Sequence, residues 1–338
     1  MRRLNLEWLP ANGFPGQSNL IKNHRHFFMA VATFLALSSS AVSVAAQQPG
    51  ADKGIPVQIV VGLEPKHGHE LPTITKQDVM VYQGRDRRPV ISWVPAKGDK
   101  AGLALAILID EGAGISLGTE LSEIRTFIGQ QAATTLVAVG YMQNGTVFMA
   151  QNFTMDHAAA AKSVRLAQGF YGATASPYLS LSDFIKRWPA DPAVPRREVL
   201  MITSGIDNVF MGTLQNPYVD AAIRDAQCGG VLVYSIYTPS AGHFGHSYYR
   251  TYWGQNYLAE LSETTGGEGY YLMGPQAPVA FAPYLDELNG QLPNQFLLTF
   301  LANPLKKAGT EPVKVTSEIH DVDFVHAEKV CVPASPGQ

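Results

Sequence analysis

The stretch LALAILIDEGAG, residues 103–114, decides the fold of this chain. It is an unbroken apolar run that ends on Asp110 and passes into a glycine-rich turn before a helical pattern begins near residue 116. Unbroken apolar runs are typical of strands buried on both faces of a parallel sheet. Chains of this kind usually carry their chemistry at the turn, which here consists of Glu111, Gly112, Ala113 and Gly114. Beside the carboxylate of Asp110, the turn therefore offers the carboxylate of Glu111 and no hydroxyl group.

The alternation of strands and helices continues beyond this stretch and predicts an α/β domain over residues 99–292. The Asn144-Gly145 pair predicts a hairpin, which makes the strand that follows it an antiparallel edge strand. The fold class is α/β, with a doubly wound, mostly parallel sheet and helices on both of its faces. Further strands are expected at 135–141, 147–153, 198–203, 231–237 and 269–272, and helices at 116–130, 156–168, 176–188, 217–228, 254–265 and 278–288.

Alternating apolar and polar residues on both sides of this domain predict β structure of a different kind. The patterns lie at 55–98 and at 293–333. We expect short antiparallel strands in both segments. We also expect the two segments to pack together as one accessory unit beside the α/β domain.

The N-terminus has the pattern of a secretory signal. Basic residues precede an apolar run at 27–37, and the segment ends on Val44-Ala45-Ala46, an A-x-A-like cleavage site. We expect a signal peptide at 1–46 and a flexible lead-in at 47–54, with an uncleaved anchor as the alternative. The run is too short to span a bilayer, so no transmembrane span is expected in the mature chain. Export places the protein in the periplasm or outside the cell.

Composition restricts the partners and the redox chemistry. The chain is 46% hydrophobic and 16% charged, with a net charge of -3, so nothing indicates a nucleic-acid partner. The two cysteines are Cys228 and Cys331. An exported protein can join them in a disulfide. The alternative, a pair of buried free thiols, is equally compatible with the sequence.

Three loops are expected at the carboxyl ends of the strands, where doubly wound sheets bind ligands near the switch point of the strand order. The first is 110–114, after the opening strand. The second is 172–174, before a helix, and the third is 203–208, after the fourth strand.

These loops resemble the metal-ion-dependent adhesion site of von Willebrand factor type A domains. That family carries D-x-S-x-S after the first strand, a threonine before a middle helix and an aspartate in a T-D-G-like turn after the fourth strand. A VWFA-related subgroup described from acidobacteria is similar to this chain at KQDVMVYQGRDRRPVISW (76–93), GQNYLAELSETTGGEGYYL (254–272) and NQFLLTF (294–300). The resemblance spans roughly 57–331. It implies a von Willebrand A or Rossmann-like fold and a site in which one Mg²⁺ grips a partner's carboxylate.

Carried over residue by residue, the resemblance implies that the site is degenerate. Asp110 matches the first aspartate and Thr174 matches the threonine. Gly112 and Gly114 stand in place of the two serines, and Ser204 stands where the second aspartate belongs. Because Mg²⁺ requires near-octahedral oxygen ligation, the loss of two hydroxyls and a carboxylate predicts little or no metal binding.

Two other uses of the same residues are alternatives. A weak Mg²⁺ or Ca²⁺ site would use Asp110 and Thr174, with a carboxylate from Glu111 or Asp207. Against this, Asp207 is expected to bond its own turn, and Asp110 to cap the bend that the glycines permit. A hydrolase using Asp110 or Ser204 is the second alternative, although Ser204 lies in T-S-G and not in a G-x-S-x-G elbow, and no P-loop or G-x-G-x-x-G fingerprint follows any predicted strand.

The stretch HFGHSYYRTYWGQNY, residues 243–257, is expected to form a loop at the same edge of the sheet. Clustered aromatic residues with polar tips are favoured at recognition surfaces. The alternative is that they pack the loop onto the domain. The sequence therefore predicts an exported, non-enzymatic module that binds a protein or cell-envelope ligand, with no firm cofactor. The aromatic residues in question are Phe244, Tyr248, Tyr249, Tyr252 and Trp253.

Overall fold

The apolar runs form strands and helices in the computed structural model. The predicted signal peptide and nearly all of the lead-in lie outside the residues that it describes, and so do Thr174 and Phe244. Within the part of the chain that is described, no helix is both long and apolar enough to cross a membrane. The described residues are 54–66, 70–114, 117–168, 176–188, 194–210, 215–241, 247–271, 278 and 280–335.

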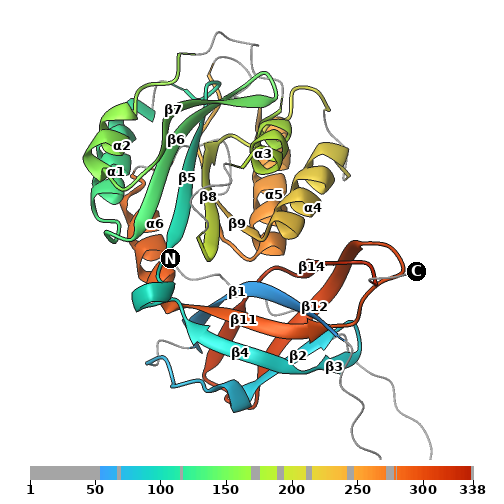
Figure 1. Ribbon diagram of the computed structural model, residues 1–338. Helices are drawn as coiled ribbons and strands as arrows, with labels where there is room; N and C mark the ends of the chain where they lie inside the picture. Colours follow the sequence, from blue (N-terminus) through green and yellow to red (C-terminus); the bar gives the residue numbers. More distant parts are fainter. Residues whose placement is uncertain are drawn as a thin grey trace, which may run out of the picture. The chain divides into compact units, whose positions relative to one another are not determined.

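A six-stranded sheet forms the centre of the α/β domain, in the spatial order β10-β9-β8-β5-β6-β7 (Figure 1). All neighbouring strands are parallel except β7, which runs antiparallel to β6. Counted along the chain within this sheet, the order is 3-2-1-4-5-6, which is typical of doubly wound sheets. The strands are β5 (Leu103–Asp110), β6 (Thr135–Gln143), β7 (Thr146–Thr154), β8 (Arg196–Thr203), β9 (Val231–Tyr237) and β10 (Gly269–Tyr270).

The predicted hairpin at the edge of this sheet is confirmed. Asn144 and Gly145 both have positive φ, at 52° and 76°. Two positive φ values in a two-residue turn match the right-handed twist of the flanking strands. Every residue of β5 is buried, as expected for a strand covered on both faces.

Helices cover both faces of the sheet (Figure 1), and each face has its own apolar core. On one face lie α1 (Leu117–Gly129), α2 (His157–Ser163) and α6 (Ala282–Gln291). On the other face lie α3 (Pro177–Lys186), α4 (Pro217–Gly229) and α5 (Tyr248–Thr265).

Three helices differ from the sequence prediction by more than two residues at one or both ends. The helix predicted at 156–168 is shorter, and the one predicted at 278–288 begins and ends later. The largest difference is α5, which begins at Tyr248 and not at residue 254. The Ser247 side chain starts it by accepting a hydrogen bond from the Arg250 backbone N–H. The prediction of a loop over 243–257 is therefore wrong for residues 248–257, which are helical.

The flanking segments form a β-sandwich below the α/β domain in Figure 1. Its two four-stranded sheets have the orders β13-β1-β11-β4 and β14-β12-β2-β3, and they enclose a separate apolar core. In the first of these sheets β1 pairs antiparallel with β11, so strands from both ends of the described chain lie side by side. The strands are β1 (Ile55–Pro65), β2 (Val79–Gln83), β3 (Asp86–Arg88), β4 (Val90–Pro95), β11 (Gln295–Ala302), β12 (Gly309–Ser317), β13 (Val322–Val325) and β14 (Lys329–Val332).

The chain leaves the sandwich for the α/β domain and returns to it at neighbouring points. At the end of β4, Pro95 lies opposite Phe296 of β11. The backbone N–H of Ala96 donates to the carbonyl of Gln295 at 2.9 Å. The whole α/β domain is therefore inserted between two paired strands.

A buried polar group lies where β8 begins, close to this junction. The Arg196 guanidinium donates to the Gln295 side-chain oxygen at 2.6 Å and to the carbonyls of Leu292 and Ala101. Two residues further, Glu198 is fully buried, and neither of its carboxylate oxygens has a hydrogen-bond partner among the described residues. Burial raises the pKa of Glu198 to about 7, although the nearby charge of Arg196 opposes this rise.

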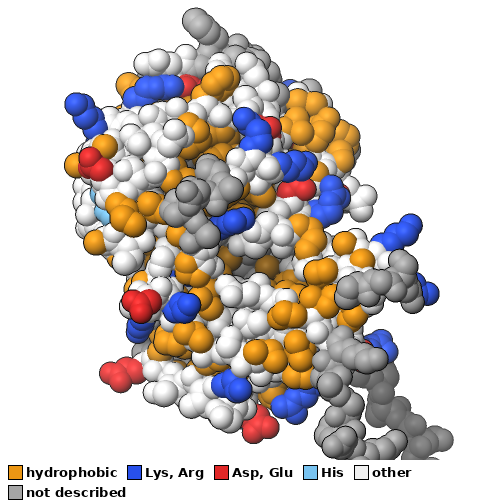
Figure 2. Space-filling view, in the orientation of Figure 1, with side chains coloured by type: hydrophobic (Ala, Val, Ile, Leu, Met, Phe, Trp, Pro, Cys, Tyr) orange, Lys and Arg blue, Asp and Glu red, His pale blue; other side chains and the backbone are white. Residues whose placement is uncertain are grey.

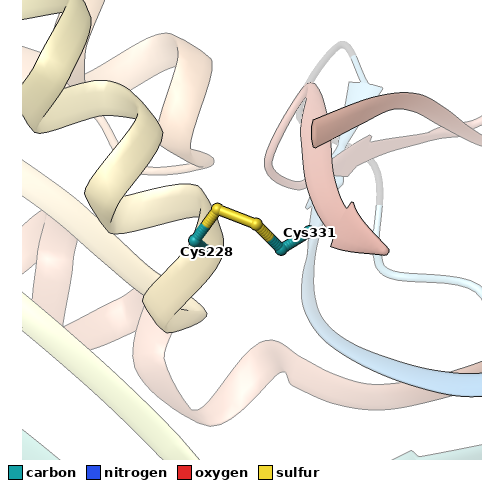
Figure 3. The surroundings of a disulfide bond; sticks show 2 residues. All are labelled: Cys228 and Cys331. Atoms are coloured by element: carbon teal, nitrogen blue, oxygen red, sulfur yellow. A yellow bond between two sulfur atoms is a disulfide. The ribbon is translucent and has the colours of Figure 1, made fainter. Parts of the chain in front are cut away.

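A disulfide joins Cys228 and Cys331, which settles the alternative that the sequence left open. Figure 3 shows the bond running from the end of α4 to β14. It closes a loop with a sequence separation of 103 residues. The bond therefore ties the α/β domain covalently to the sandwich.

The surface carries charge of both signs. On the face shown in Figure 2, Lys and Arg side chains are interspersed with Asp and Glu, and hydrophobic groups lie between them. A nucleic-acid site would require a concentration of positive charge, and this face has none.

Candidate functional site at the carboxyl edge of the sheet

The carboxyl ends of β5 and β8 are neighbours at the switch point of the sheet. Asp110 ends β5 and is almost completely buried. One of its oxygens accepts the Gly112 backbone N–H at 2.8 Å, and the other accepts the Thr203 hydroxyl at 2.6 Å. Burial raises the pKa of Asp110, while these two hydrogen bonds act in the opposite direction. Both oxygens of the best matched metal ligand are thus held by the chain itself.

Glu111 points into an internal ion pair. Its carboxylate binds the Arg165 guanidinium at 2.5 Å and also accepts the backbone N–H of Gln168. The same guanidinium lies over the Tyr141 ring, 3.8 Å from its centre, a favourable cation–π arrangement. The carboxylate that was a candidate metal ligand is therefore neutralised by Arg165.

The two glycines of the turn support backbone contacts. The N–H of Gly114 donates to the carbonyl of Pro239 at 2.8 Å, and the carbonyl of Gly112 accepts the N–H of Ala241 at 2.8 Å. Ala113 and Ser240 form an isolated antiparallel bridge. The turn after β5 is thereby bound to the segment after β9.

Ser204, a candidate site residue of the third loop, also bonds internally. Its hydroxyl oxygen accepts the Ser240 hydroxyl at 2.7 Å and the backbone N–H of Ile206 at 3.3 Å. Ser204 is buried. Both groups bonded to this hydroxyl are neutral donors, whereas the serine of a hydrolase is activated by an adjacent base.

Asp207 joins the beginnings of two helices. One of its oxygens accepts the backbone N–H groups of Val209 and Phe210, at 2.8 and 2.9 Å. The other accepts the Ser176 hydroxyl at 2.9 Å and the Asn216 side-chain amide at 3.0 Å. Ser176 caps α3 and Asn216 caps α4. The helix dipoles favour a negative charge at this position, and four donors surround the buried carboxylate.

The predicted bonding of Asp207 to its own turn is confirmed by these contacts. The sequence did not reveal Arg165 or Asn216 as members of the site, whereas Ser176 ends the loop 172–176 that the sequence places on the binding face. The two caps had a signal, because each precedes a proline at the first turn of a helix. No sequence signal pointed to Arg165, because it lies 54 residues from Glu111 in the chain.

The aromatic residues at the start of α5 are divided between surface and interior. Tyr248, Tyr249 and Tyr252 are 68%, 62% and 46% exposed. Trp253 is partly buried, and its ring contacts the Tyr249, Tyr252 and Tyr257 rings at centroid distances of 5.8–6.1 Å. Helical spacing therefore presents some of these rings to solvent and packs the others inward.

A cavity of about 280 Å³ lies between the third loop and α5. Within the described residues, no group of three or more His, Cys, Asp or Glu side chains is placed to hold a metal ion. The lining residues are Ile206, Asp207, Phe210, Tyr249, Arg250, Trp253, Gly254 and Tyr257.

No protein-family model matches the sequence, and neither does any curated protein. Several solved structures are similar in fold. An aerotolerance-related membrane protein from Bacteroides fragilis matches 56% of this chain and 98% of its own at 11% identity and a TM-score of 0.42. The conserved hypothetical protein BatB from Bacteroides thetaiotaomicron matches 56% and 97% at 14% identity and a TM-score of 0.40. The SpRpn10 VWA domain matches 56% and 94% at 10% identity and a TM-score of 0.34.

At these identities and TM-scores, the likeness says nothing of ligand, partner or activity. The strand order 3-2-1-4-5-6, the antiparallel edge hairpin and the helices on both faces carry the assignment instead. The α/β domain has a von Willebrand A-like fold.

Proposed function

We propose that this chain is an exported, non-enzymatic binding module that takes a protein or cell-surface ligand at the carboxyl edge of its sheet, with little or no dependence on a metal ion. One observation carries the proposal. The two buried aspartates of this edge, Asp110 and Asp207, already accept hydrogen bonds from the chain at every carboxylate oxygen.

The chemistry of divalent ions supports the metal-independent form of the proposal. Mg²⁺ needs about six oxygens in near-octahedral geometry, and its carboxylate ligands must be ionised. Burial raises the pKa of Asp110, which acts against ionisation. Glu111 is paired with Arg165. An entering ion would have to displace several internal hydrogen bonds before it gained any of its own.

The exposed tyrosines supply the alternative means of contact. Tyrosine is enriched at binding interfaces because its large ring loses little side-chain entropy and its hydroxyl still forms hydrogen bonds. Tyr248, Tyr249 and Tyr252 leave much of their surface in solvent at one edge of the domain. Of the three, Tyr249 also lines the cavity of about 280 Å³.

Calorimetric titration with Mg²⁺, Mn²⁺ and Ca²⁺ tests the metal-independent form. We expect no binding heat at millimolar metal for the wild-type chain. Heat that disappears in Asp110→Asn would instead support the metal-dependent alternative. A screen of ester, phosphate and peptide substrates addresses the hydrolase alternative, and turnover lost in Ser204→Ala would support it.

Binding itself is tested by capture from envelope fractions on the immobilised protein. We expect one or a few components to be retained by the wild type and by Ile91→Ala, which removes an exposed side chain on β4 of the sandwich. The double variant of Tyr248→Ala and Tyr252→Ala should lose them. Equal capture by all three proteins would overturn the assignment of this edge.

A further inference from the structure

The disulfide between the α/β domain and the sandwich is open to solvent. Cys228 is exposed and Cys331 is half-buried, and Figure 3 shows the bond crossing from the end of α4 to β14. Exposed disulfides are reduced more easily than enclosed ones, and they include those with regulatory roles. The bond therefore has the accessibility that thiol–disulfide exchange requires.

A cavity of about 260 Å³ lies beside the bond. Both cysteines line it, together with Ile59 of β1 and Thr265 at the end of α5. A water molecule takes up about 30 Å³ in the liquid, so the cavity has room for water or for a small thiol. The bond can thus be approached from a space that the α/β domain and the sandwich enclose together.

The two sulfur atoms differ in their surroundings. Cys228 lies in the last turn of α4, where the helix dipole disfavours a negative charge. Cys331 shares the outward face of β14 with Lys329, because the alternate residues Val330 and Val332 are buried in the sandwich core. A nearby positive charge stabilises a thiolate and makes it a better leaving group in exchange. An external thiol is therefore expected to attack the exposed sulfur of Cys228 and to displace that of Cys331.

We propose that the sulfur of Cys228 is a site of thiol–disulfide exchange with a dithiol, and that this exchange frees the α/β domain to move against the sandwich while both stay folded. The proposal goes beyond the binding function of the carboxyl edge and does not depend on it. It assigns to this bond a role as a reversible connection between the two parts of the protein.

The exchange proceeds in two steps. A thiolate of the dithiol attacks Sγ of Cys228, the bond between the two sulfur atoms breaks, and its electron pair passes to Sγ of Cys331, which takes a proton from water. The second thiolate of the dithiol then attacks the first sulfur of the dithiol in the mixed disulfide and releases Cys228, which is protonated in turn. The dithiol is thereby oxidised to a disulfide, and the disulfide of the protein is reduced to two thiols.

After reduction, noncovalent contacts hold the neighbouring part of the junction. The backbone N–H of Glu328 donates to the carbonyl of Thr264 at 3.0 Å. A Cβ at Gly266 would overlap backbone atoms of His326 and Ala327, so the end of α5 touches the sandwich there. Because the net contribution of a hydrogen bond is small, we expect the junction to open more often once the covalent bond is gone.

Reduction of the intact protein by dithiothreitol, followed by alkylation and mass spectrometry, tests the access to the bond. We expect the rate to rise in proportion to the dithiothreitol concentration and to change by less than about twofold in about 1 M urea. Reduction that required global unfolding would instead speed up at least about fivefold per molar of urea, since the free energy of unfolding falls linearly with urea concentration. That result would overturn the proposal.

Reaction with excess glutathione, quenched early with acid, locates the attacked sulfur. We expect the mixed disulfide at Cys228 and a free thiol at Cys331. Lys329→Gln should slow the reaction about twofold at low salt, as for the loss of one exposed charge. Lys162→Gln, at an exposed lysine of α2 on the opposite face of the central sheet from α4, should leave the rate unchanged. A mixed disulfide formed chiefly at Cys331 would overturn the assignment of Cys228.

Residual dipolar couplings of the backbone amides test the release of the α/β domain. In the oxidised protein, one common alignment should describe the couplings of the α/β domain and of the sandwich. In the reduced protein, and in the double variant of Cys228→Ser and Cys331→Ser with or without dithiothreitol, we expect this common alignment to be lost while the amide resonances of β5 keep their positions. A common alignment that survives reduction would refute the release, and loss of the β5 resonances would show that reduction unfolds the domain, which also contradicts the proposal.

Discussion

The buried Glu198 should make the stability of this protein fall as the pH rises towards neutrality. In the folded chain its pKa is about 7, against an ordinary value of 4.5. Between these two values the folded chain holds a proton that the unfolded chain releases, so the free energy of unfolding decreases as pH increases. The stabilising contribution is complete below about pH 4.5 and is lost as the pH passes 7. The difference between the two pKa values corresponds to about 3 kcal/mol.

Glu198→Gln removes the titration and keeps the shape of the side chain. The difference in free energy of unfolding between this variant and the wild type should change by about 3 kcal/mol between pH 4 and pH 8, in favour of the variant at pH 8. Urea unfolding at a series of pH values, with the disulfide intact, measures this difference in the free energy of unfolding. Glu318→Gln at an exposed site is the matched control and should show no such change. A stability difference for Glu198→Gln that is the same at both pH values would refute the reasoning.

Three further predictions concern stability. Replacing both Cys228 and Cys331 by serine should lower the free energy of unfolding by about 4–5 kcal/mol, from the chain entropy of a loop with a separation of 103 residues, measured by urea unfolding. Asp207→Asn places an amide N–H₂ group among hydrogen-bond donors, so it should lower the free energy of unfolding by about 2–3 kcal/mol in the same assay. Gly254→Ala drives a methyl group into the carbonyl of Ser204 and should lower the melting temperature, at a cost of about 2 kcal/mol.

Each of these has a control in the chain. Reduction of the wild type should shift its urea midpoint as far as the double serine variant does, and an unchanged midpoint would contradict the role of the disulfide. Asp99→Asn, at an exposed residue, is the control for Asp207→Asn and should leave the free energy of unfolding unchanged. Gly290→Ala lies in α6 with open space around its Cβ position, so it should be neutral or slightly stabilising, in contrast to Gly254→Ala.

Hydrophobic pattern predicted the central sheet because burial on both faces leaves a direct trace in the sequence. The run 103–109 is apolar throughout because each of its residues is enclosed. Asn144-Gly145 specifies the turn between β6 and β7 through backbone sterics. The start of α5 was missed for the converse reason. Its first turns present Tyr248, Tyr249 and Tyr252 to solvent, so the apolar period that marks a helix is absent there.

The state of the site could be predicted only in part. The tendency of Asp207 to bond its own turn is visible in the sequence, whereas the replacement of two hydroxyl ligands by Gly112 and Gly114 stays a prediction from the family resemblance. The hydrogen-bond partners of Asp110 and the ion-pair partner of Glu111 are determined by tertiary contacts. Thr203 reaches Asp110 only because β8 lies beside β5 in the sheet, and no local pattern encodes that neighbourhood.

The hydrogen bond between Ala96 and Gln295 makes β4 and β11 the two arms of one hairpin whose connection happens to be a complete domain. The sandwich therefore supports the α/β domain, and the α/β domain could be exchanged for another without changing the pairing of β4 with β11. A two-residue turn would close the same hairpin, and a different domain whose ends lie equally close together could be grafted at the same position. The bond between Cys228 and Cys331 and the hydrogen bonds between the two parts, such as that from Arg196 to Gln295, would have to be re-created for the new domain to be held as firmly as the old one.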